Sequence, residues 1–463
     1  MASTSTLLQH LPPEVICQIF AWSLRFDQDG QDEDAFRKPP WQLGHICESL
    51  RFIALGYPPL WNSIAISPRS SEQLRAMVET QVLRSANGPL EVYWDEWGSE
   101  EVDFPDFRCA ELLLTHCTRW RSLQLRLSAG FEFGPSWLSP CAGRLDALEK
   151  LTVLGYDYTG ALERIFTVAP RLREVILTDS QLGMYSDSGL VLPWGQITHY
   201  RGTYRAQQHI EILKQTSSLL ECKVSLRLHL DYLPGDNLPA VLPRLRRLCI
   251  EQPRLLDRLQ TPVLEELCCV RNWRLDISAL LPFFHNSACS LTTLVMMTCT
   301  ICPELIEVIR GLSSLTYAFI ESSDERHGKT GAQYKHTSTL FSTLTISDTA
   351  TDEPVCPELT SFVFGFAPEF PLDVFLSMAR SRFDFKPGVM CFRLFGYDNS
   401  TFDTSSLFNI QVYSNMRHSL PLFPALESCP TSMVVPLQLL RDEGFDIAFL
   451  GRRDIKMLKA KWF

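Results

Sequence analysis

The sequence lacks any long apolar run, and no segment approaches the roughly 18 residues needed to span a bilayer. It also lacks a basic stretch followed by an apolar one at its start, so we expect no signal peptide. The chain has no excess of positive charge, and its net charge of -10 disfavours binding to nucleic acid or to an anionic membrane. We therefore expect a protein of the cytoplasm or the nucleus, with neither nucleic acid nor a membrane as its partner.

Motifs of catalysis and metal binding are also missing. There is no H-E-x-x-H and no G-x-S-x-G, and the ten histidines form no recognisable constellation. Cys299 and Cys302 form one C-x-x-C, with His285 and Cys289 upstream, but no second pair follows to complete a zinc site. We expect no catalytic residue, no metal and no cofactor, and cysteines that stay reduced.

One segment resembles the end of a phosphate-binding loop, Gly328-Lys329-Thr330. The first glycine of that motif belongs at position 323, where the chain has Ser323. The loop needs a flexible glycine there so that its backbone amides can surround a phosphate. The residues favour a polar surface loop over 322–339, with nucleotide binding as the alternative.

The first sixty residues predict two amphipathic helices. Residues 11–20 begin with prolines and Glu14, which suit a helix N-terminus, and then place apolar side chains on one face. After an acidic stretch over 27–34, residues 43–54 repeat the apolar helical spacing, and 58–61 close the unit. Some fifty residues are too few for an independent core, so these apolar faces must be buried against something else.

This segment resembles the F-box, in the form abundant in fungal proteins. The residues that match, in order, are Leu11, Pro12, Glu14, Ile19, Phe20, Cys47, Ile53, Ala54, Leu60 and Trp61. The chain departs from the family in its acidic insert, in Leu50 where tryptophan is usual, and in Glu48 and Ser49 where basic residues are common.

The resemblance covers about residues 7–64 and implies docking on a Skp-type adaptor, which links to a cullin. The adaptor-binding residues that it implies are Leu11, Pro12, Glu14, Val15, Ile16, Ile19, Phe20, Leu43, Cys47, Leu50, Ile53, Leu60 and Trp61. The alternative is a helical cap that packs on the rest of the chain.

An apolar-x-x-apolar-x-apolar pattern recurs through the remaining sequence. Its candidate starts are Trp120, Leu148, Leu172, Ile197, Leu219, Leu245, Leu264, Leu291, Leu315, Phe341, Leu359 and Val389. Their spacings, 18 to 30 residues, lie around the length of leucine-rich repeats. A stricter form with a leading proline occurs at Pro170, Pro243, Pro262 and Pro357, where composition predicts roughly one chance match.

Helix-like segments lie between several of these predicted strands. They are Ala161–Ala169, Ala206–Gln215, Pro303–Gly311 and Leu372–Arg380. A proline cannot continue a helix and favours extended geometry before it, so it marks the entry to a strand. The alternation predicts an α/β fold, namely a small helical F-box followed by a leucine-rich-repeat-like solenoid with a curved, mostly parallel sheet. An ordinary α/β domain with parallel strands is the alternative.

We divide the chain into four predicted segments. They are an F-box over 1–66, a connecting helical and loop segment with the repeat cap over 67–118, an irregular solenoid over 119–400, and a C-terminal cap with a basic tail over 401–463. For the basic end, residues 452–463, we expect a solvated helix, with packing beside an acidic face of the repeats as the alternative.

Alternate residues of each strand point to opposite faces, so residues between the pattern positions line the concave side. They are polar in the early repeats, as at Ser122, Gln124 and Arg126, and become apolar further along. An exposed apolar patch usually marks a contact site. The residues that we expect to bind a target protein are Cys268, Val270, Val295, Met297, Tyr317 and Phe319. The alternative is that a loop or the C-terminal segment covers this patch as ordinary core.

The sequence therefore favours a non-catalytic substrate-receptor subunit of an SCF-type (Skp-cullin-F-box) ubiquitin ligase. Such a subunit holds a target protein near the ubiquitin-charged enzyme and acts by proximity. Two alternatives remain. One is a leucine-rich-repeat scaffold without adaptor binding, which the departures at Glu48, Ser49 and Leu50 favour, and the other is a nucleotide-dependent enzyme built around Gly328–Thr330.

Overall fold

The computed structural model is an α/β protein with a long, mostly parallel sheet. It describes residues 11–26, 41, 43, 46–66, 72–95, 108–127, 136–155, 162, 164–179, 190–226, 238–270, 277–322, 330–347, 353–366, 370–386, 389–396, 431–450, 452–460 and 462. The chain divides into two compact units, Met1–Tyr204 and Arg205–Phe463. Among the described residues, no helix is long and apolar enough to cross a membrane.

The first unit begins with a helical pair and continues as a parallel ladder. Its helices are α2 (Pro13–Phe26), α3 (Glu48–Leu55), α4 (Glu72–Arg84) and α5 (Arg108–Leu114), with 3-10 turns η3 (Pro58–Trp61), η4 (Cys117–Arg119), η5 (Ser136–Cys141) and η6 (Trp194–Gln196). Its strands are β1 (Ser63–Ile66), β2 (Leu90–Asp95), β3 (Trp120–Leu127), β4 (Lys150–Gly155), β5 (Glu174–Asp179) and β6 (His199–Tyr204). Each strand pairs in parallel with the next one along the chain.

The second unit repeats this arrangement. Its helices are α6 (Ala206–Leu213), α7 (Leu280–Ser287), α8 (Pro303–Arg310), α9 (Thr330–Leu344), α10 (Leu372–Phe385), α11 (Thr431–Asp442) and α12 (Arg452–Ala460), with η7 (Pro253–Arg258) and η8 (Ile277–Ala279). Its main strands are β7 (Glu221–Leu226), β9 (Arg247–Ile250), β11 (Glu266–Cys269), β12 (Thr293–Cys299), β13 (Tyr317–Ser322), β14 (Ser361–Phe366), β15 (Cys391–Gly396) and β16 (Asp446–Phe449).

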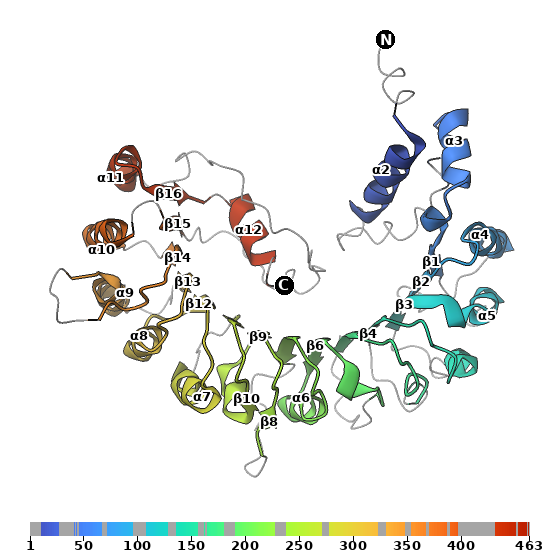
Figure 1. The fold of residues 1–463 in the computed structure, drawn as a ribbon, viewed down its shortest axis with the longest axis horizontal. Helices are drawn as coiled ribbons and strands as arrows, with labels where there is room; N and C mark the ends of the chain where they lie inside the picture. Colours follow the sequence, from blue (N-terminus) through green and yellow to red (C-terminus); the bar gives the residue numbers. More distant parts are fainter. Residues whose placement is uncertain are drawn as a thin grey trace, which may run out of the picture. The chain divides into compact units, whose positions relative to one another are not determined.

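These main strands are parallel and follow one another in chain order. Two short strands, β8 (Ala240–Val241) and β10 (Leu259–Gln260), form a separate parallel pair. Figure 1 shows α7 to α11 on one side of the main strands and α12 on the other. We call this second side, which faces α12, the inner face of the second unit.

The recurring apolar pattern predicts the strands well. After every candidate start from Leu148 to Val389 except Phe341, a strand begins two residues later, and β3 begins at Trp120 itself. The prediction at Phe341 is wrong, because that residue lies in α9. Its neighbours Leu340 and Leu344 are buried with it, which is helical spacing, and its ring contacts Phe362 of β14.

The predicted helices are mostly correct. The segments from Ala206, Pro303 and Leu372 form α6, α8 and α10. The helix predicted over Ala161–Ala169 is wrong, since its described residues form turns. The backbone hydrogen bonds there join residues three apart, as in a turn, instead of four apart, as in an α-helix. One example is the Thr167 N–H, which donates to the Arg164 carbonyl at 3.3 Å. Several branched side chains, which restrict helical rotamers, precede Pro170 in this segment.

The sheet extends beyond the predicted solenoid at both ends. The segment 67–118 contains α4, β2 and α5, and β2 pairs with β3 from Leu90 to Asp95. At the other end β16 pairs with β15, so part of 401–463 continues the sheet. The two-unit division at Tyr204 also differs from the four predicted segments. Short strands without the full apolar pattern escape a search for that pattern.

Candidate functional site

The N-terminal helical pair builds a small core of its own. Ile16 and Phe20 of α2 pack with Leu50 and Ala54 of α3 and with the buried end of η3. The side chains that line the margin of this core are Leu11, Trp41, Leu43, Ile53 and Tyr57. The second predicted helix begins later than its spacing indicated, since Cys47 is extended and α3 starts at Glu48.

Trp61 joins this small core to the strands that follow. Its indole Nε1 donates a hydrogen bond to the carbonyl oxygen of Ala54 at 2.9 Å. The Trp41 ring packs edge-on against it, with ring centroids 5.0 Å apart. The guanidinium of Arg84, from α4, lies 4.3 Å from the Trp61 ring centroid. Burial lowers the pKa of Arg84, and the aromatic faces offset part of that cost by cation–π attraction.

The predicted adaptor-binding residues differ in exposure and form three groups. Those buried in the small core, and so not accessible to an adaptor, are Ile16, Phe20, Leu50, Leu60 and Trp61. Leu11, Leu43 and Ile53 are partly buried. The members that are exposed are Pro12, Glu14, Val15, Ile19 and Cys47. The helical pair and η3 supply the cover that the sequence argument attributed to a partner.

Apolar residues that the sequence argument missed are also exposed on this pair. Phe52 is 81% exposed on α3, Leu55 is exposed on the same helix, and Ile46 is exposed before the helix begins. Phe52 and Leu55 are three residues apart and share one side of the helix, away from buried Leu50 and Ala54. A helical projection of residues 48–55 is the signal that could have found Phe52 and Leu55. We call Val15, Ile19, Ile46, Phe52 and Leu55 the exposed apolar set.

The polar strands of the first unit present ion pairs on the side opposite their buried leucines. In β3, Leu123, Leu125 and Leu127 are buried, and Arg126 between them lies 3.9 Å from Asp95 of β2. Lys150 Nζ lies 2.7 Å from Glu174 Oε1. These pairs are partly exposed, so each contributes at most about 1 kcal/mol. Their main effect is to make this surface charged, and they stabilise the fold only a little.

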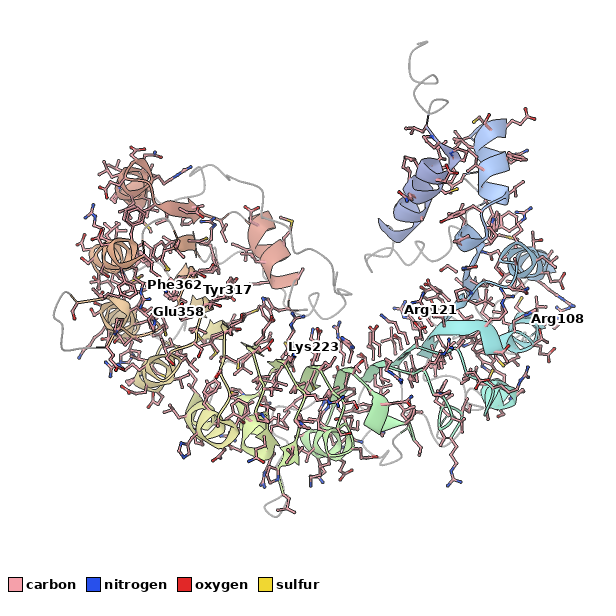
Figure 2. The ribbon with its side chains drawn as sticks, viewed as in Figure 1. Arg108, Arg121, Lys223, Tyr317, Glu358 and Phe362 are labelled. Carbon is pink, nitrogen blue, oxygen red and sulfur yellow. The ribbon has the colours of Figure 1, made fainter. Side chains whose placement is uncertain are left out.

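The inner face of the second unit is apolar, as the sequence predicts, but it is not exposed. Its side chains are Cys249, Cys268, Val270, Val295, Met297, Phe319, Val363 and Phe395, with Tyr317 at the margin. Cys249, Cys268, Val295, Phe319 and Val363 stand opposite one another in register across five neighbouring strands. Figure 2 shows Tyr317 on this face and Phe362 on the helix side of the sheet.

The C-terminal segment covers this row, so the expectation of an exposed patch is wrong and the alternative of a C-terminal cover is confirmed. Leu450, Ile455 and Trp462 are buried against the inner face, and Leu458 packs at its edge. The prediction of a solvated C-terminal helix is wrong for the same reason. An amphipathic helix buries its apolar stripe wherever a matching apolar surface is available.

A buried ion pair fixes α12 to the sheet. Lys459 Nζ donates a hydrogen bond to Glu321 Oε1 of β13 at 2.6 Å, and the two side chains are 6% and 3% exposed. The second oxygen of Glu321, Oε2, is buried and accepts no hydrogen bond from the described residues. The alternative of packing beside an acidic face of the repeats is not met either, because α12 packs on an apolar face, with Glu321 as the acidic partner of Lys459.

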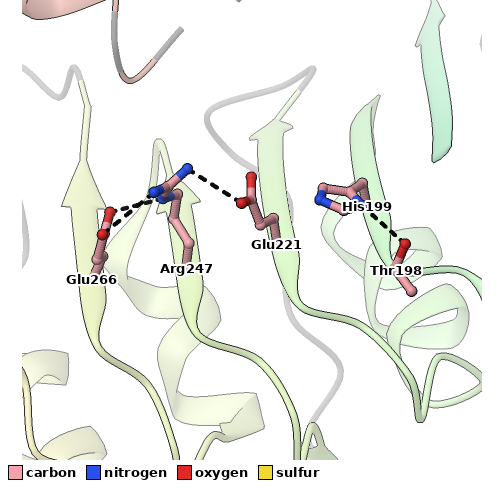
Figure 3. A network of polar contacts seen from close by, with 5 residues as sticks. All are labelled: Thr198, His199, Glu221, Arg247 and Glu266. Carbon is pink, nitrogen blue, oxygen red and sulfur yellow. Dashed lines mark hydrogen bonds and ion pairs between the residues drawn. The ribbon is translucent and has the colours of Figure 1, made fainter. Parts of the chain in front are cut away.

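Two further contacts shape the inner face. A Cβ at Gly365 would lie 2.4 Å from the Phe395 ring, so only glycine lets this ring lie over β14. Phe395 thereby reaches Phe319, with ring centroids 5.8 Å apart. Arg247 lies between Glu221 at 3.3 Å and Glu266 at 2.7 Å (Figure 3). Its guanidinium is 5.8 Å from the Trp462 ring centroid.

In the first unit, Thr198 and His199 form a hydrogen bond 2.9 Å long (Figure 3).

The buried and half-buried thiols of the second unit whose pKa values shift are not activated, because their pKa values are raised. Burial raises the pKa of Cys268, and the hydrogen-bonded Cys249 thiol raises it further. Burial likewise raises the pKa of Cys299 and takes that of Cys302 to about 11. Within the described part of the chain, no group of three potential metal-ligating side chains occurs. Gly328 and Lys329, which the phosphate-loop alternative needs, lie outside the described residues. The expected surface loop over 322–339 is wrong from Thr330 on, because α9 begins there.

The geometry thus presents two candidate contact surfaces, one in each unit. The exposed apolar set lies on a small, self-contained helical pair, and the inner face of the second unit is already occupied by α12. No protein-family model and no curated protein matches this chain.

Proposed function

We propose that this chain is the substrate-receptor subunit of an SCF-type ubiquitin ligase, with α2 and α3 as an F-box that docks on a Skp-type adaptor. The observation that supports the proposal best is the exposed apolar set on the N-terminal helical pair. Phe52, Val15 and Ile19 remain in solvent although the pair has its own core. Several large exposed apolar side chains on one small helical unit favour a protein contact.

The departure at Leu50 affects packing and leaves the proposed contact unchanged. Leu50 is buried between α2 and α3, so replacing the family's usual tryptophan changes the small core. Glu48 and Ser49 are exposed on α3. They stand where the family commonly has basic residues, so here the departure changes the charge of the surface. The scaffold alternative without adaptor binding rests on these two positions.

The remainder of the chain supports the receptor role. The strands follow the repeat pattern in chain order and pair in parallel, which agrees with a leucine-rich-repeat-like solenoid. In the proposed complex this array holds a target protein close to the ubiquitin-charged enzyme, and the increased effective concentration of target lysines accelerates transfer. The adaptor connects the receptor to the cullin.

Co-purification tests the proposal. The full chain, co-expressed with a Skp-type adaptor, is expected to elute with it as one complex. Phe52→Asp places a charge in the proposed contact and is expected to remove the adaptor from the complex. Leu83→Asp is the matched control, because Leu83 is 79% exposed on α4 and outside the proposed contact. Elution of the folded wild-type chain without the adaptor would favour the scaffold alternative.

A further inference from the structure

The helix α12 contacts the inner face of the second unit through one continuous stripe. Ile455, Leu458, Lys459 and Trp462 follow the spacing i, i+3, i+4 and i+7, which places them on one side of a helix. Trp462 follows the last helical residue, and its N–H donates to the Lys459 carbonyl at 2.9 Å, so the turn continues to it. This spacing is how an amphipathic helix binds in an apolar groove of another protein.

The sheet has a separate core on the side away from α12. That side is covered by α7 to α10, and Leu294, Met296 and Phe362 are buried there. The helix α12 has nine residues, and Met457 on its outer side is 44% exposed. A short helix that contacts the sheet through one stripe is a candidate for local opening while the strands stay paired.

The Lys459–Glu321 pair gives the inner face a charge preference. Two buried apolar side chains would stabilise such a contact as well as a buried ion pair does, because burial removes the hydration of both charges. An unpaired Glu321 would instead penalise any occupant that lacks a cation at this place. Glu321 follows Phe319 by two residues on β13 and stands opposite Gly365, which in turn stands opposite Phe395. Its charge therefore selects the occupant of an otherwise apolar surface.

We propose that the inner face of the second unit is a helix-binding groove, that α12 occupies it in the free chain as a self-ligand, and that the partner is a protein helix with the same stripe. That stripe carries an aliphatic residue, a cation four positions later and an aromatic residue seven positions later. The inference rests on the proposed function, because it specifies the class of target that the receptor would hold. Target binding then requires α12 to leave the groove.

The test uses the full chain and a labelled synthetic peptide of residues 450–463. In the wild type, α12 competes with the peptide at a high effective concentration, so peptide binding is expected to be on the order of a hundredfold weaker than in an undocked variant. The undocked variant is Ile455→Asp with Trp462→Asp, which places two charges against the inner face. Met457→Asp is the matched control, because Met457 is exposed on the outer side of α12 and its variant is expected to bind like the wild type.

Saturable peptide binding to the undocked variant, measured by fluorescence anisotropy, supports the inference. If a peptide that carries the Lys459→Glu substitution does not bind the undocked variant, this supports the charge preference. No peptide binding to an undocked variant that still unfolds cooperatively overturns the proposal.

Hydrogen exchange in the wild-type chain gives a second measurement if the undocked variant does not fold. We expect α12 amides to exchange by local opening, faster than those of β12 and β13 and without dependence on low urea concentrations. Exchange of α12 only by global unfolding overturns the inference. The adaptor lies on the first unit in our proposal, so adaptor co-purification with the same variants separates a failure of this inference from a failure of the proposed function.

Discussion

Lys459 of α12 and Glu321 of β13, 138 residues apart in the sequence, form a buried ion pair with Nζ and Oε1 2.6 Å apart. The pair joins the C-terminal helix to β13, where Glu321 follows Phe319 of the inner face by two residues. It defines the way in which the C-terminal segment engages the rest of the second unit.

Replacing one partner of this ion pair is expected to release α12. In Lys459→Met, Glu321 would remain buried without a cation, which costs about 3–5 kcal/mol, so α12 opens and lets water reach the carboxylate. We expect amide exchange of α12 to rise by on the order of a hundredfold, with β13 unchanged. Lys459→Met combined with Glu321→Leu is expected to restore protection, because no charge is then buried. Unchanged α12 protection in Lys459→Met would contradict this account.

Arg382 of α10 is a buried cation that serves the fold. Its Nε donates to the Leu344 carbonyl at 2.8 Å, its Nη1 to the Cys356 carbonyl at 2.8 Å, and its Nη2 to the Val355 carbonyl. Burial lowers its pKa to about 10, so it stays charged at neutral pH.

Arg382→Met removes the donors to these three carbonyls, each of which costs about 1–3 kcal/mol when left unpaired. We expect the free energy of unfolding of the second unit to fall by at least about 3 kcal/mol, measured by urea titration. Arg380→Met on the same helix is the control. Arg380 forms an exposed pair with Glu443, so its loss is expected to cost less than about 1 kcal/mol. Equal effects of the two variants would refute the structural role of Arg382.

His209 of α6 is expected to make stability depend on pH. It is fully buried, its Nε2–H donates to the Ser225 carbonyl at 3.1 Å, and burial lowers its pKa to about 4 from 6.5. Between these values the unfolded chain binds the proton more tightly, so the free energy of unfolding decreases as the pH falls. The contribution is fully present above pH 6.5, and about 3 kcal/mol is lost on acidification to pH 4.

The check compares the wild type with His209→Gln, which keeps a side-chain donor without a titrating ring. Urea midpoints at several pH values between 7.5 and 4.5 are expected to fall more steeply in the wild type. Parallel pH profiles for the two proteins would exclude His209 as the source.

Leu50 and Phe52 lie two residues apart on α3 and are expected to respond in opposite ways. Leu50→Ala leaves a cavity between α2 and α3 and is expected to destabilise the helical pair by about 2–5 kcal/mol. Phe52→Ala removes an exposed ring and is expected to change stability by less than about 0.5 kcal/mol. Hydrogen exchange of the α2 amides measures the effect of each substitution on the helical pair. A large loss of protection in Phe52→Ala would mean that the ring is part of the core.

Much of the strand order could be predicted because one pattern recurs with its flanking residues. Pro170, Pro243, Pro262 and Pro357 each precede a strand that starts where the pattern indicates. Phe341 fits the pattern without its proline although it lies in a helix, because Phe341, Leu344 and Ile346 are apolar at those spacings. A local apolar pattern does not distinguish a strand from a helix when both sides of the strand are buried.

The covering of the inner face could not be predicted in the same way. Strand alternation correctly gave the side to which Val295, Met297 and Phe319 point, because that depends on neighbouring residues alone. What packs against that side depends on a segment more than a hundred residues away, and the pairing of Lys459 with Glu321 leaves no local signal. The sequence likewise did not show which predicted adaptor-binding residues are covered within the N-terminal unit itself, as Ile16, Phe20 and Leu50 are.

The central claim is the docking of the N-terminal helical pair on a Skp-type adaptor, and a calorimetric titration of the purified full chain with that adaptor tests it most directly. We expect saturation at one adaptor per chain, with a dissociation constant of about 1 μM or tighter. Phe52→Asp is expected to weaken binding at least about tenfold, a loss of about 1.4 kcal/mol, and Leu83→Asp to leave it unchanged. No binding of the folded wild-type chain at micromolar concentrations would contradict the account.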